Sequence, residues 1–421
     1  MQELSNYAVG LDIGTTTVRV VVGHRDEGAA SPTIIGIGEA PNSGMRKGVV
    51  VNLVTTAQAV DKALEEAERV SGHQIDGATI SINGNHVLGM SSKGVVAVGS
   101  RDHEINSEDL ARVEDAATVV QLPANREILD VTPRSFSLDD QDNIRDPIGM
   151  NGVRLEVDAY VITALTPNLN NVLKVADMTK TGVHHSVPAG LAAAHAILTD
   201  RQKENGVVLV DIGGTTTNIA VYDEGDLQHV AVLPVGGVNI TNDLAVGLKV
   251  DLDIAEKVKL QHAVAVSTAR KTSDKKADAK KVTIKTDSQT YDFDTETIDD
   301  VVEARLEEIF ESVNDELKNI GRQANLPGGA ILTGGSSRIK GIDSYAKEAL
   351  QLAVKIGAAE GYGGVAENIN QPQYATAVGL MLMDLDNQNR GRGHHSNDDG
   401  SGFSLGKITS PIKGILGKFR S

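Results

Sequence analysis

The sequence contains no cysteine and no tryptophan, and aromatic residues make up only 3% of its 421 residues. The absence of cysteine excludes disulfide bonds, cysteine-ligated zinc and thiol catalysis. The scarcity of aromatic side chains predicts cores built from aliphatic ones. No apolar run approaches the ~20 residues that a membrane-spanning helix requires, and the first ten residues lack the basic and apolar segments of a signal peptide. We therefore expect a cytoplasmic protein.

Acidic side chains outnumber basic ones by 57 to 40, which gives a formal net charge of −17. Binding to nucleic-acid phosphates needs a basic face, so this balance argues against a nucleic-acid partner. The length corresponds to about two to three domains. The apolar content of 40% argues against global disorder.

One supersecondary unit occurs twice in the chain. Residues 7–23 place Asp12-Ile-Gly-Thr-Thr between two β-rich runs, and residues 206–223 place Asp211-Ile-Gly-Gly-Thr between two others. A short Gly-Thr turn between such runs predicts a β-hairpin. The two aspartates lie 199 positions apart (211 − 12 = 199). We interpret the pattern as an internal duplication.

Strand-like runs alternate with segments of helical periodicity, which indicates an α/β fold with mixed sheets. The last such helical segment is predicted at 373–385. Two polar or charged stretches do not fit the duplicated unit and are interpreted as insertions. The predicted organisation is a first core of residues 1–83 and 159–200, an inserted subdomain of residues 84–158, a second core of residues 201–239 and 300–385, a second inserted subdomain of residues 240–299, a disordered linker of residues 386–405 and a C-terminal amphipathic helix of residues 406–421.

The two hairpins carry the residue types that bind nucleotide phosphates. Glycine turns offer backbone N–H groups, threonines offer hydroxyls, and an aspartate at the end of a strand can hold Mg²⁺ through water. A third glycine cluster follows an apolar run at 330–333 and would receive the nucleoside. The predicted phosphate and magnesium residues are Asp12, Gly14, Thr15, Thr16, Asp211, Gly213, Gly214, Thr215 and Thr216, and the predicted nucleoside residues are Gly334, Gly335, Ser336 and Arg338. Gly236 and Gly237 are also predicted to bind the nucleotide.

Two hairpins, a later Thr-Gly-Gly-Ser turn and two insertions together resemble the actin, hexokinase and heat-shock-chaperone ATPase superfamily. Within it, the chain is similar to the FtsA family of bacterial cell-division proteins. The segments that carry this resemblance are Ile80-Ser-Ile-Asn-Gly-Asn-His86, Arg126-Glu-Ile-Leu and Ile144-Arg-Asp-Pro-Ile-Gly-Met-Asn-Gly-Val-Arg-Leu-Glu156. The resemblance covers nearly all of residues 5–385 and then the extreme tail.

The resemblance implies an actin-like ATPase fold in which ATP and Mg²⁺ lie between the two halves. Glu256 and Lys259, on a predicted helix of the second insertion, would reach the purine or ribose; the alternative is that they lie on a solvated helix face. It also implies filaments of this protein, binding of the C-terminal peptide of the tubulin-like protein FtsZ by the second insertion, and contacts of the first insertion with neighbouring subunits or other division proteins.

Hydrolysis of the nucleotide is expected to be slow or absent. Actin-type ATPases place a glutamine or glutamate at the start of the helix before the second hairpin, where it orients the attacking water. This chain has Ser186-Val-Pro-Ala189 there. Because neither valine nor proline polarises water, we expect ATP binding with weak or no turnover.

The C-terminal tail predicts an amphipathic helix that lies on a membrane surface. Its apolar residues recur at helical spacing, and it carries four basic and no acidic residues. The remaining residues, 1–405, therefore carry a formal net charge of −21 (−17 − 4 = −21). This pattern favours attraction to anionic lipid at the inner face of the membrane. The alternative is a helix that docks on the protein's own core. The residues predicted to contact lipid are Ile408, Ile412, Lys413, Ile415, Leu416, Lys418 and Phe419.

Two other functions share the hairpins. A small-molecule kinase of the same superfamily would need a carboxylate base and a substrate pocket, and a basic amphipathic tail is not expected in it. An actin-like pilus-assembly adaptor would also lack the long linker and the tail. The sequence therefore favours a division protein that polymerises on the membrane and tethers FtsZ to it.

Overall fold

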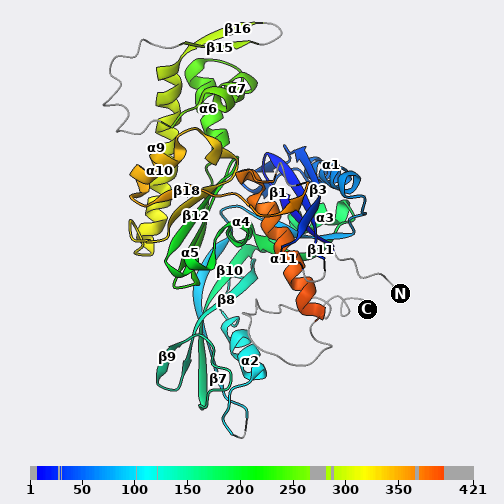
Figure 1. The fold of residues 1–421 in the computed structure, drawn as a ribbon, viewed down its shortest axis with the longest axis vertical. Helices are drawn as coiled ribbons and strands as arrows, with labels where there is room; N and C mark the ends of the chain where they lie inside the picture. The colour runs from blue at the N-terminus through cyan, green and yellow to red at the C-terminus, as the bar shows by residue number, and fades with distance from the viewer. Residues whose placement is uncertain are drawn as a thin grey trace. The chain divides into compact units, whose positions relative to one another are not determined.

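The structure, a computed structural model, describes residues 7–26, 29, 31–100, 102–120, 122–265, 281–285, 289–365 and 369–392. A larger unit lies within Met1–Leu88 and Ala164–His395, and a smaller one comprises Gly89–Thr163. The larger unit contains both copies of the predicted hairpin (Figure 1). The predicted tail helix of residues 406–421 and the predicted linker from residue 393 onward lie outside the described residues.

The first half of the larger unit is built on a sheet of six strands in the order β11-β6-β1-β2-β3-β19. β1 and β2 form the first predicted hairpin, with Asp12 directly opposite Arg19. β6 and β11 then add parallel strands on the other side of β1. The strands are β1 (Tyr7–Ile13), β2 (Thr17–His24), β3 (Thr33–Pro41), β6 (Gly77–Ile82), β11 (Gly182–Pro188) and β19 (Gly363–Gly364), with a separate short pair β4 (Met45–Arg46) and β5 (Val49–Val50).

The second half repeats this arrangement in the order β14-β13-β12-β17-β18. Its hairpin of β12 and β13 places Asp211 opposite Asn218, and β17 and β18 are again parallel additions. The matching strand orders confirm the duplication predicted from the sequence. The strands are β12 (Val207–Ile212), β13 (Thr217–Asp223), β14 (Asp226–Leu233), β17 (Gly329–Thr333) and β18 (Val354–Ile356).

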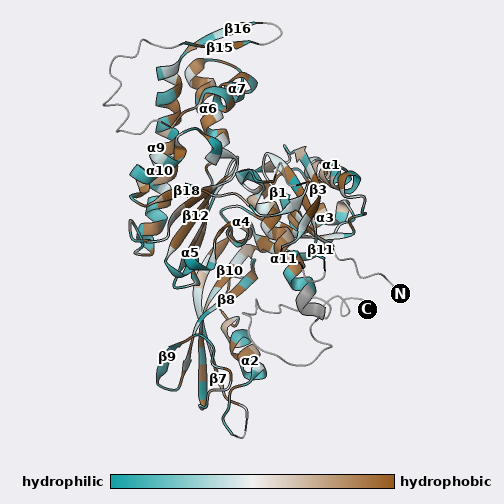
Figure 2. Cartoon of the chain, viewed as in Figure 1, coloured by the Kyte–Doolittle hydropathy of each residue, from teal (hydrophilic) through white to brown (hydrophobic). Residues whose placement is uncertain are grey.

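The central strands are buried along their whole length, as expected where both faces of a sheet are covered. Every residue of β6, β12 and β17 is buried. Figure 2 shows β12 and its neighbours in hydrophobic colours, whereas the helices around them are two-sided. These cores are aliphatic, as the composition predicts; Phe310 is the one aromatic among the largest fully buried side chains of the described residues.

Two helices that follow parallel strands cross beneath the hairpins. α4 (Ala189–Ile197) begins directly after β11, and α11 (Ala375–Arg392) ends the described chain. α11 continues seven residues past the predicted end at 385. The polar sequence there suggested a linker, but Nε2 of Gln388 donates to the carbonyl of Tyr7 at 3.3 Å and to Oδ2 of Asp384 at 3.2 Å.

Figure 1 shows α1 and α3 beside the first sheet, α9 and α10 beside the second, and α6 and α7 beyond the second sheet next to β15 and β16. α6, α7 and α9 form one hydrophobic cluster with the β15-β16 hairpin and the second sheet. The bounds are α1 (Leu53–Ser71), α3 (Thr166–Met178), α5 (Asp200–Glu204), α6 (Gly237–Leu248), α7 (Leu252–His262), β15 (Lys281–Lys285), β16 (Thr290–Asp294), α9 (Thr295–Asn319) and α10 (Ile342–Leu350), with 3₁₀ turns η1 (Gly335–Arg338) and η3 (Pro372–Tyr374).

The smaller unit is a sheet of order β7-β10-β8-β9 packed on one helix. The helix, α2, has a capping box at Asn106 and Asp109. The bounds of the unit fall five residues later than the predicted 84–158 at both ends. Most of its strand residues are polar or half exposed, which is why the sequence shows only a polar stretch there. The elements are β7 (Leu88–Ala97), α2 (Ser107–Ala117), β8 (Arg126–Leu138), β9 (Gln141–Ile144) and β10 (Arg154–Leu165).

Candidate functional site

The turns of the two hairpins meet at the centre of the larger unit. Nδ2 of Asn83, at the end of β6, donates to Oγ1 of Thr216 on the second hairpin at 3.2 Å. A Cβ atom built on Gly214 would lie 2.6 Å from Cγ2 of Thr16 on the first hairpin. Any side chain at position 214 would therefore fill space between the two hairpin turns.

A small cavity of about 60 Å³ lies between these turns. It is lined from both halves and from the beginnings of α4 and α11. Ten predicted residues line it: Asp12, Gly14, Thr15, Thr16, Asp211, Gly213, Gly214, Thr216, Gly334 and Gly335. Seven others line it that were not predicted as ligands: Thr17, Arg19, Asn83, Ala189, Asn218, Gln373 and Thr376.

The two aspartates share this cavity and have perturbed pKa values. Burial, and then the nearby carboxylate of Asp12, raise the pKa of Asp211 to about 6. Burial also raises the pKa of Asp12, while the positive charge of Arg19 opposes the shift. Two carboxylates removed from water in this way favour a neighbouring cation.

The cavity offers hydrogen-bonding atoms that the described residues leave without partners. Nε of Arg19, Oδ1 of Asn218 and Oε1 of Gln373 are buried and form no hydrogen bond within the described part of the chain. Buried polar atoms are normally paired. Carboxylates, hydroxyls, amide oxygens and one guanidinium are a suitable donor and acceptor set for Mg²⁺ and phosphates. The residue types therefore fit a magnesium–nucleotide ligand.

The volume of the cavity limits the possible ligand more strictly than the residue types do. A cavity of about 60 Å³ has room for a few water molecules, since one water needs ~10–15 Å³ by this measure. A triphosphate requires the hairpins to separate, and the Asn83–Thr216 hydrogen bond is a polar link across the gap. The closed arrangement thus accommodates a hydrated ion more readily than a whole nucleotide.

Four other predicted nucleotide-binding residues gather beside the cavity, at the start of α6. The N–H of Gly237 and Oγ of Ser336 each donate to the carbonyl of Gly213 at 3.0 Å. Nζ of Lys259 donates to the carbonyl of Gly237 at 3.1 Å and pairs with Glu256 at 2.7 Å. α7 therefore brings both of its predicted residues to this edge.

Three more of the predicted residues stand outside the cavity lining. Gly236 precedes α6 and has no room for a side chain, because a Cβ there would lie 2.7 Å from the carbonyl of Gly213. Oγ1 of Thr215 is buried without a partner in the described chain. Arg338 is exposed at the end of η1, next to Ser337. The structure places all three within the second half, around the β12–β13 turn and η1.

The duplication contained a signal for two of the unpredicted residues. Arg19 and Asn218 each stand seven positions after the hairpin aspartate and directly opposite it. Because paired residues on neighbouring strands present side chains to the same face, both had to face the site. For Gln373 and Thr376 no sequence signal existed, since only the fold brings the start of α11 to the hairpins.

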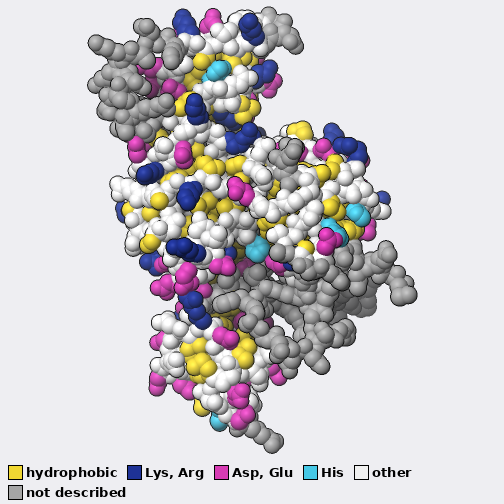
Figure 3. Space-filling view, viewed as in Figure 1, with side chains coloured by type: hydrophobic (Ala, Val, Ile, Leu, Met, Phe, Trp, Pro, Cys, Tyr) yellow, Lys and Arg dark blue, Asp and Glu magenta, His cyan; other side chains and the backbone are white. Residues whose placement is uncertain are grey.

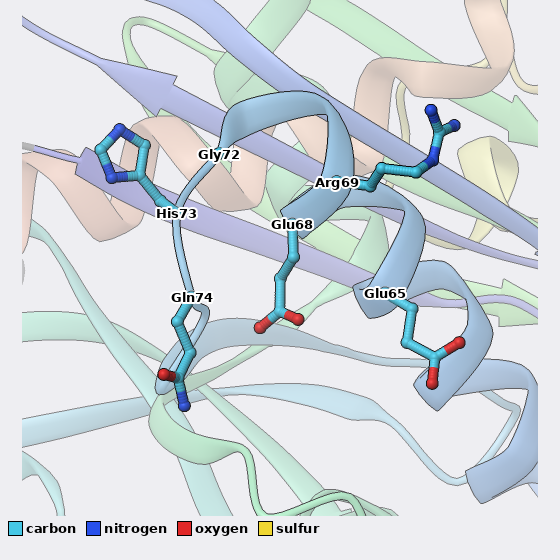
Figure 4. Close-up of a pocket in the computed structure, with 6 residues that line it drawn as sticks. All are labelled: Glu65, Glu68, Arg69, Gly72, His73 and Gln74. Carbon is cyan, nitrogen blue, oxygen red and sulfur yellow. The ribbon is translucent and has the colours of Figure 1, made fainter.

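A second hollow lies at the end of α1 and is open to solvent. Figure 4 shows Glu65, Glu68 and Arg69 on the helix, with His73 and Gln74 on the segment that follows. Oε1 of Glu68 accepts from the N–H of Ile75 at 2.7 Å, which ties this carboxylate to the backbone. The hollow has neither the burial nor the unpaired atoms of the hairpin cavity.

Comparison with known proteins assigns the chain to a family. A family model described as "Cell division protein FtsA" matches residues 208–379, and one described as "SHS2 domain inserted in FTSA" matches residues 84–163. Cell division protein FtsA of Bacillus subtilis is 38% identical over 375 residues, covering 89% of this chain and 82% of that protein. The chain belongs to the FtsA family. Its relative in Pseudomonas aeruginosa is 36% identical, covering 89% of this chain and 88% of that protein.

Solved structures with lower identity share the fold. A PilM–PilN type IV pilus biogenesis complex aligns with a TM-score of 0.65 at 18% identity, covering 90% of this chain and 98% of that chain. MreB5 of Spiroplasma citri bound to AMPPNP aligns with a TM-score of 0.52 at 14% identity, covering 93% and 99%. The FtsA-family fold of this chain is therefore actin-like, as the sequence predicted.

Two negative findings concern the described residues. No group of three or more histidine or acidic side chains there is arranged to hold a metal ion directly. None of the described helices combines the length and hydropathy needed to cross a membrane.

Proposed function

We propose that this FtsA-family protein binds ATP with Mg²⁺ between its two halves and acts as an actin-like adaptor in cell division. The observation that carries the proposal is the hairpin cavity. Asp12 and Asp211 face the same cavity from equivalent positions of a duplicated unit. The glycine turns beside them would leave room for phosphates once the hairpins separate.

The actin-like relative MreB5 supports the identity of the nucleotide, because one of its structures holds AMPPNP and another ADP. In this chain Gly334 and Gly335 line the cavity, and Gly237, Ser336 and Lys259 surround its edge. The nucleoside would lie against these residues once the hairpins separate. Mg²⁺, when bound, offsets the charge of the phosphates and of the two aspartates.

Turnover of ATP is proposed to be slow. α4 begins at Ala189, which lines the cavity with a methyl group. The preceding residues, Val187 and Pro188, carry no polar side-chain atom. The start of this helix therefore offers nothing to orient an attacking water.

A direct test uses the full chain and a fluorescent ATP analogue. We expect binding in the presence of Mg²⁺ and a loss of at least about tenfold in affinity for Gly214→Val, whose side chain would meet Thr16. Gly363→Ala is the control, since a Cβ at position 363 would meet nothing nearer than Oγ1 of Thr33 at 3.8 Å and the position has no positive φ. Absence of nucleotide binding by the unaltered protein would refute the proposal.

We propose further that the second insertion receives the C-terminal peptide of FtsZ. α6 and α7 pack on each other, yet Val246 is 78% exposed and Leu260 is 73% exposed. Figure 3 shows hydrophobic and basic side chains together over this part of the molecule. Exposed apolar side chains on a two-helix surface suit an amphipathic peptide.

The tail is proposed to attach filaments of this protein to the cytoplasmic face of the membrane at the division site. Each basic residue contributes about 1 kcal/mol near anionic lipid, so one tail would bind reversibly. A filament that presents many tails would bind much more tightly because of their high local concentration. The smaller unit would contact neighbouring subunits or other division proteins.

Vesicle co-sedimentation tests this attachment. The full chain and a truncation that ends at residue 405 are mixed with anionic vesicles, with and without ATP and Mg²⁺. We expect only the full chain to pellet, and ATP to increase the pelleted fraction. If both proteins remain in the supernatant at low salt, the tail is not an anchor.

A further inference from the structure

The duplicated hairpins are asymmetric at one position. Arg19 stands opposite Asp12 in the first hairpin, and Asn218 stands opposite Asp211 in the second. The first aspartate thus has a cation as its strand partner, whereas the second has an amide. The amide donates to Asp211, with Nδ2 of Asn218 at 3.1 Å from Oδ2, but it brings no positive charge.

This bond fixes how the amide of Asn218 is turned. Its NH₂ group is held by Asp211, so Oδ1 is directed away from that carboxylate. Asn218 is 2% exposed, lines the cavity, and its Oδ1 accepts nothing from the described residues. A buried amide oxygen in this position requires a donor that enters the cavity.

Gln373 repeats this arrangement from a different element, the η3 turn. Its Nε2 donates to Oε1 of Gln371, and its own Oε1 is buried and unpaired within the described chain. Like Asn218, it lines the cavity. Two amide oxygens and the carboxylates of Asp12 and Asp211 are therefore hydrogen-bond acceptors around one small volume.

The occupant must bring several donors and positive charge. Mg²⁺ gives up its water reluctantly and usually keeps several molecules of it, all of whose protons point outward. The described residues include no group of three or more acidic or histidine side chains placed for direct ligation, whereas acceptors for water protons surround the cavity. The volume of about 60 Å³ suits an ion with part of its water shell.

We propose that Asn218 and Gln373 are positioning residues for Mg²⁺, and that their amide oxygens accept hydrogen bonds from water molecules bound to the ion. The inference rests on the proposed ATP–Mg²⁺ site and extends it to two residues outside the phosphate-binding turns. Asp12 and Asp211 supply the negative charge, and the two amides select a hydrated ion over a bare one.

The test measures how much Mg²⁺ strengthens ATP binding, as the ratio of the dissociation constants without and with the ion. For Asn218→Ala and Gln373→Met we expect this ratio to fall by about tenfold each, as for a lost hydrogen bond to a charged group. Gln373→Met leaves the Asn218–Asp211 bond intact and so separates the effect from a disturbed aspartate.

Asn314→Ala is the matched control. Nδ2 of Asn314 donates to the carbonyl of Ala349 at 2.8 Å, and its Oδ1 is likewise buried and unpaired within the described chain. It lies on α9, outside the cavity lining. We expect its ratio to equal that of the unaltered protein.

Cobalt hexammine is the second probe, because its ammine ligands donate hydrogen bonds but do not exchange. We expect it to replace Mg²⁺ in the unaltered protein and to lose its effect in both variants. An unchanged Mg²⁺ ratio in the variants, or strengthening by Mg²⁺ but not by cobalt hexammine, would overturn the inference while ATP binding stands. Absence of ATP binding in every condition would overturn the proposed function as well.

Discussion

Nδ1 of His184 lies 2.8 Å from Oδ1 of Asp384, and this pair joins strand β11 to the last described helix, α11. Asp384 is 1% exposed and also accepts from the N–H of Val9 at 3.0 Å and from Oγ1 of Thr79 at 2.8 Å. One buried carboxylate thus connects three strands of the first sheet to a helix that crosses beneath them.

The pair predicts a pH-dependent stability. The hydrogen bond to Asp384 raises the pKa of His184 above its ordinary 6.5, against the opposing effect of burial. A raised pKa in the folded state means that the stabilisation is complete below about pH 6.5 and is lost as the pH rises through the folded value. We expect His184→Ala to lower the free energy of unfolding by about 1 kcal/mol at about pH 6 and by less at about pH 8.5.

Chemical denaturation at several pH values measures this difference. His185 is the control, because burial lowers its pKa and no hydrogen bond to Asp384 is formed by it among the described contacts. The effect of His185→Ala on the free energy of unfolding should therefore not decrease above about pH 6.5. A His184→Ala effect that is the same at both ends of this pH range would contradict the proposed charge state.

Asp211→Asn is predicted to stabilise the ligand-free protein while it weakens the site. Burial and Asp12 raise the pKa of Asp211 to about 6 from 3.8, so its ionisation opposes folding as the pH rises from about 3.8 through about 6. Without ligand at about pH 7 we expect a gain of about 1–3 kcal/mol, shrinking at about pH 5 and below. Mg²⁺-dependent ATP binding should be lost.

Denaturation with and without ATP–Mg²⁺ checks both halves of this prediction in one series. The unaltered protein should gain stability from the ligand, and the variant should not. A variant that is less stable than the unaltered protein at neutral pH without ligand would show that Asp211 is not destabilising there.

The sequence predicted the duplicated hairpins because each carries its own turn, its own β-rich runs and its own aspartate. The duplication also predicted that Asp12 and Asp211 belong to one site, and ten predicted residues do line one cavity. Gln373 could not be predicted in this way. It stands on η3, 161 positions after Ile212, the last residue of β12 (373 − 212 = 161). Local sequence patterns carry no information across such a distance, so only the fold places Gln373 at the site.

The end of α11 and the smaller unit were harder to predict for a different reason. Gln388 lies in the stretch predicted as a linker, yet it binds the first sheet from within a helix. The strands of the smaller unit carry many half-exposed polar side chains, so their alternation is weak. In both places tertiary contacts decide the structure and local preference does not.

Leu260→Glu is predicted to abolish the proposed binding of the FtsZ peptide without unfolding the protein. Leu260 is 73% exposed, so a charge there costs little in the free protein, whereas it would be desolvated under a bound apolar peptide. We expect at least about a tenfold loss of affinity by fluorescence anisotropy and a melting temperature within about 2 °C of the original.

Val119→Glu is the control for that experiment, because Val119 is 85% exposed and belongs to the smaller unit. It should leave peptide affinity unchanged. Equal losses in both variants would indicate a general effect of added negative charge, and unchanged affinity in Leu260→Glu would place the peptide elsewhere.

Gly379→Ala tests the crossing of α11 over α4. A Cβ atom at position 379 would lie 1.7 Å from the carbonyl oxygen of Ala192, and backbone on α4 cannot move aside without shifting the helix that begins at the cavity. We expect a loss of about 3 kcal/mol or more in the free energy of unfolding, despite the gain of about 1 kcal/mol that alanine brings to a helix.

Gly247→Ala in α6 is the control, since the atom nearest to its added Cβ is a methyl of Val301 at 3.2 Å. Because that methyl can give way, the control should change stability by less than about 1 kcal/mol. Equal changes in the free energy of unfolding would mean that α4 and α11 can move apart as easily as the Val301 side chain can move.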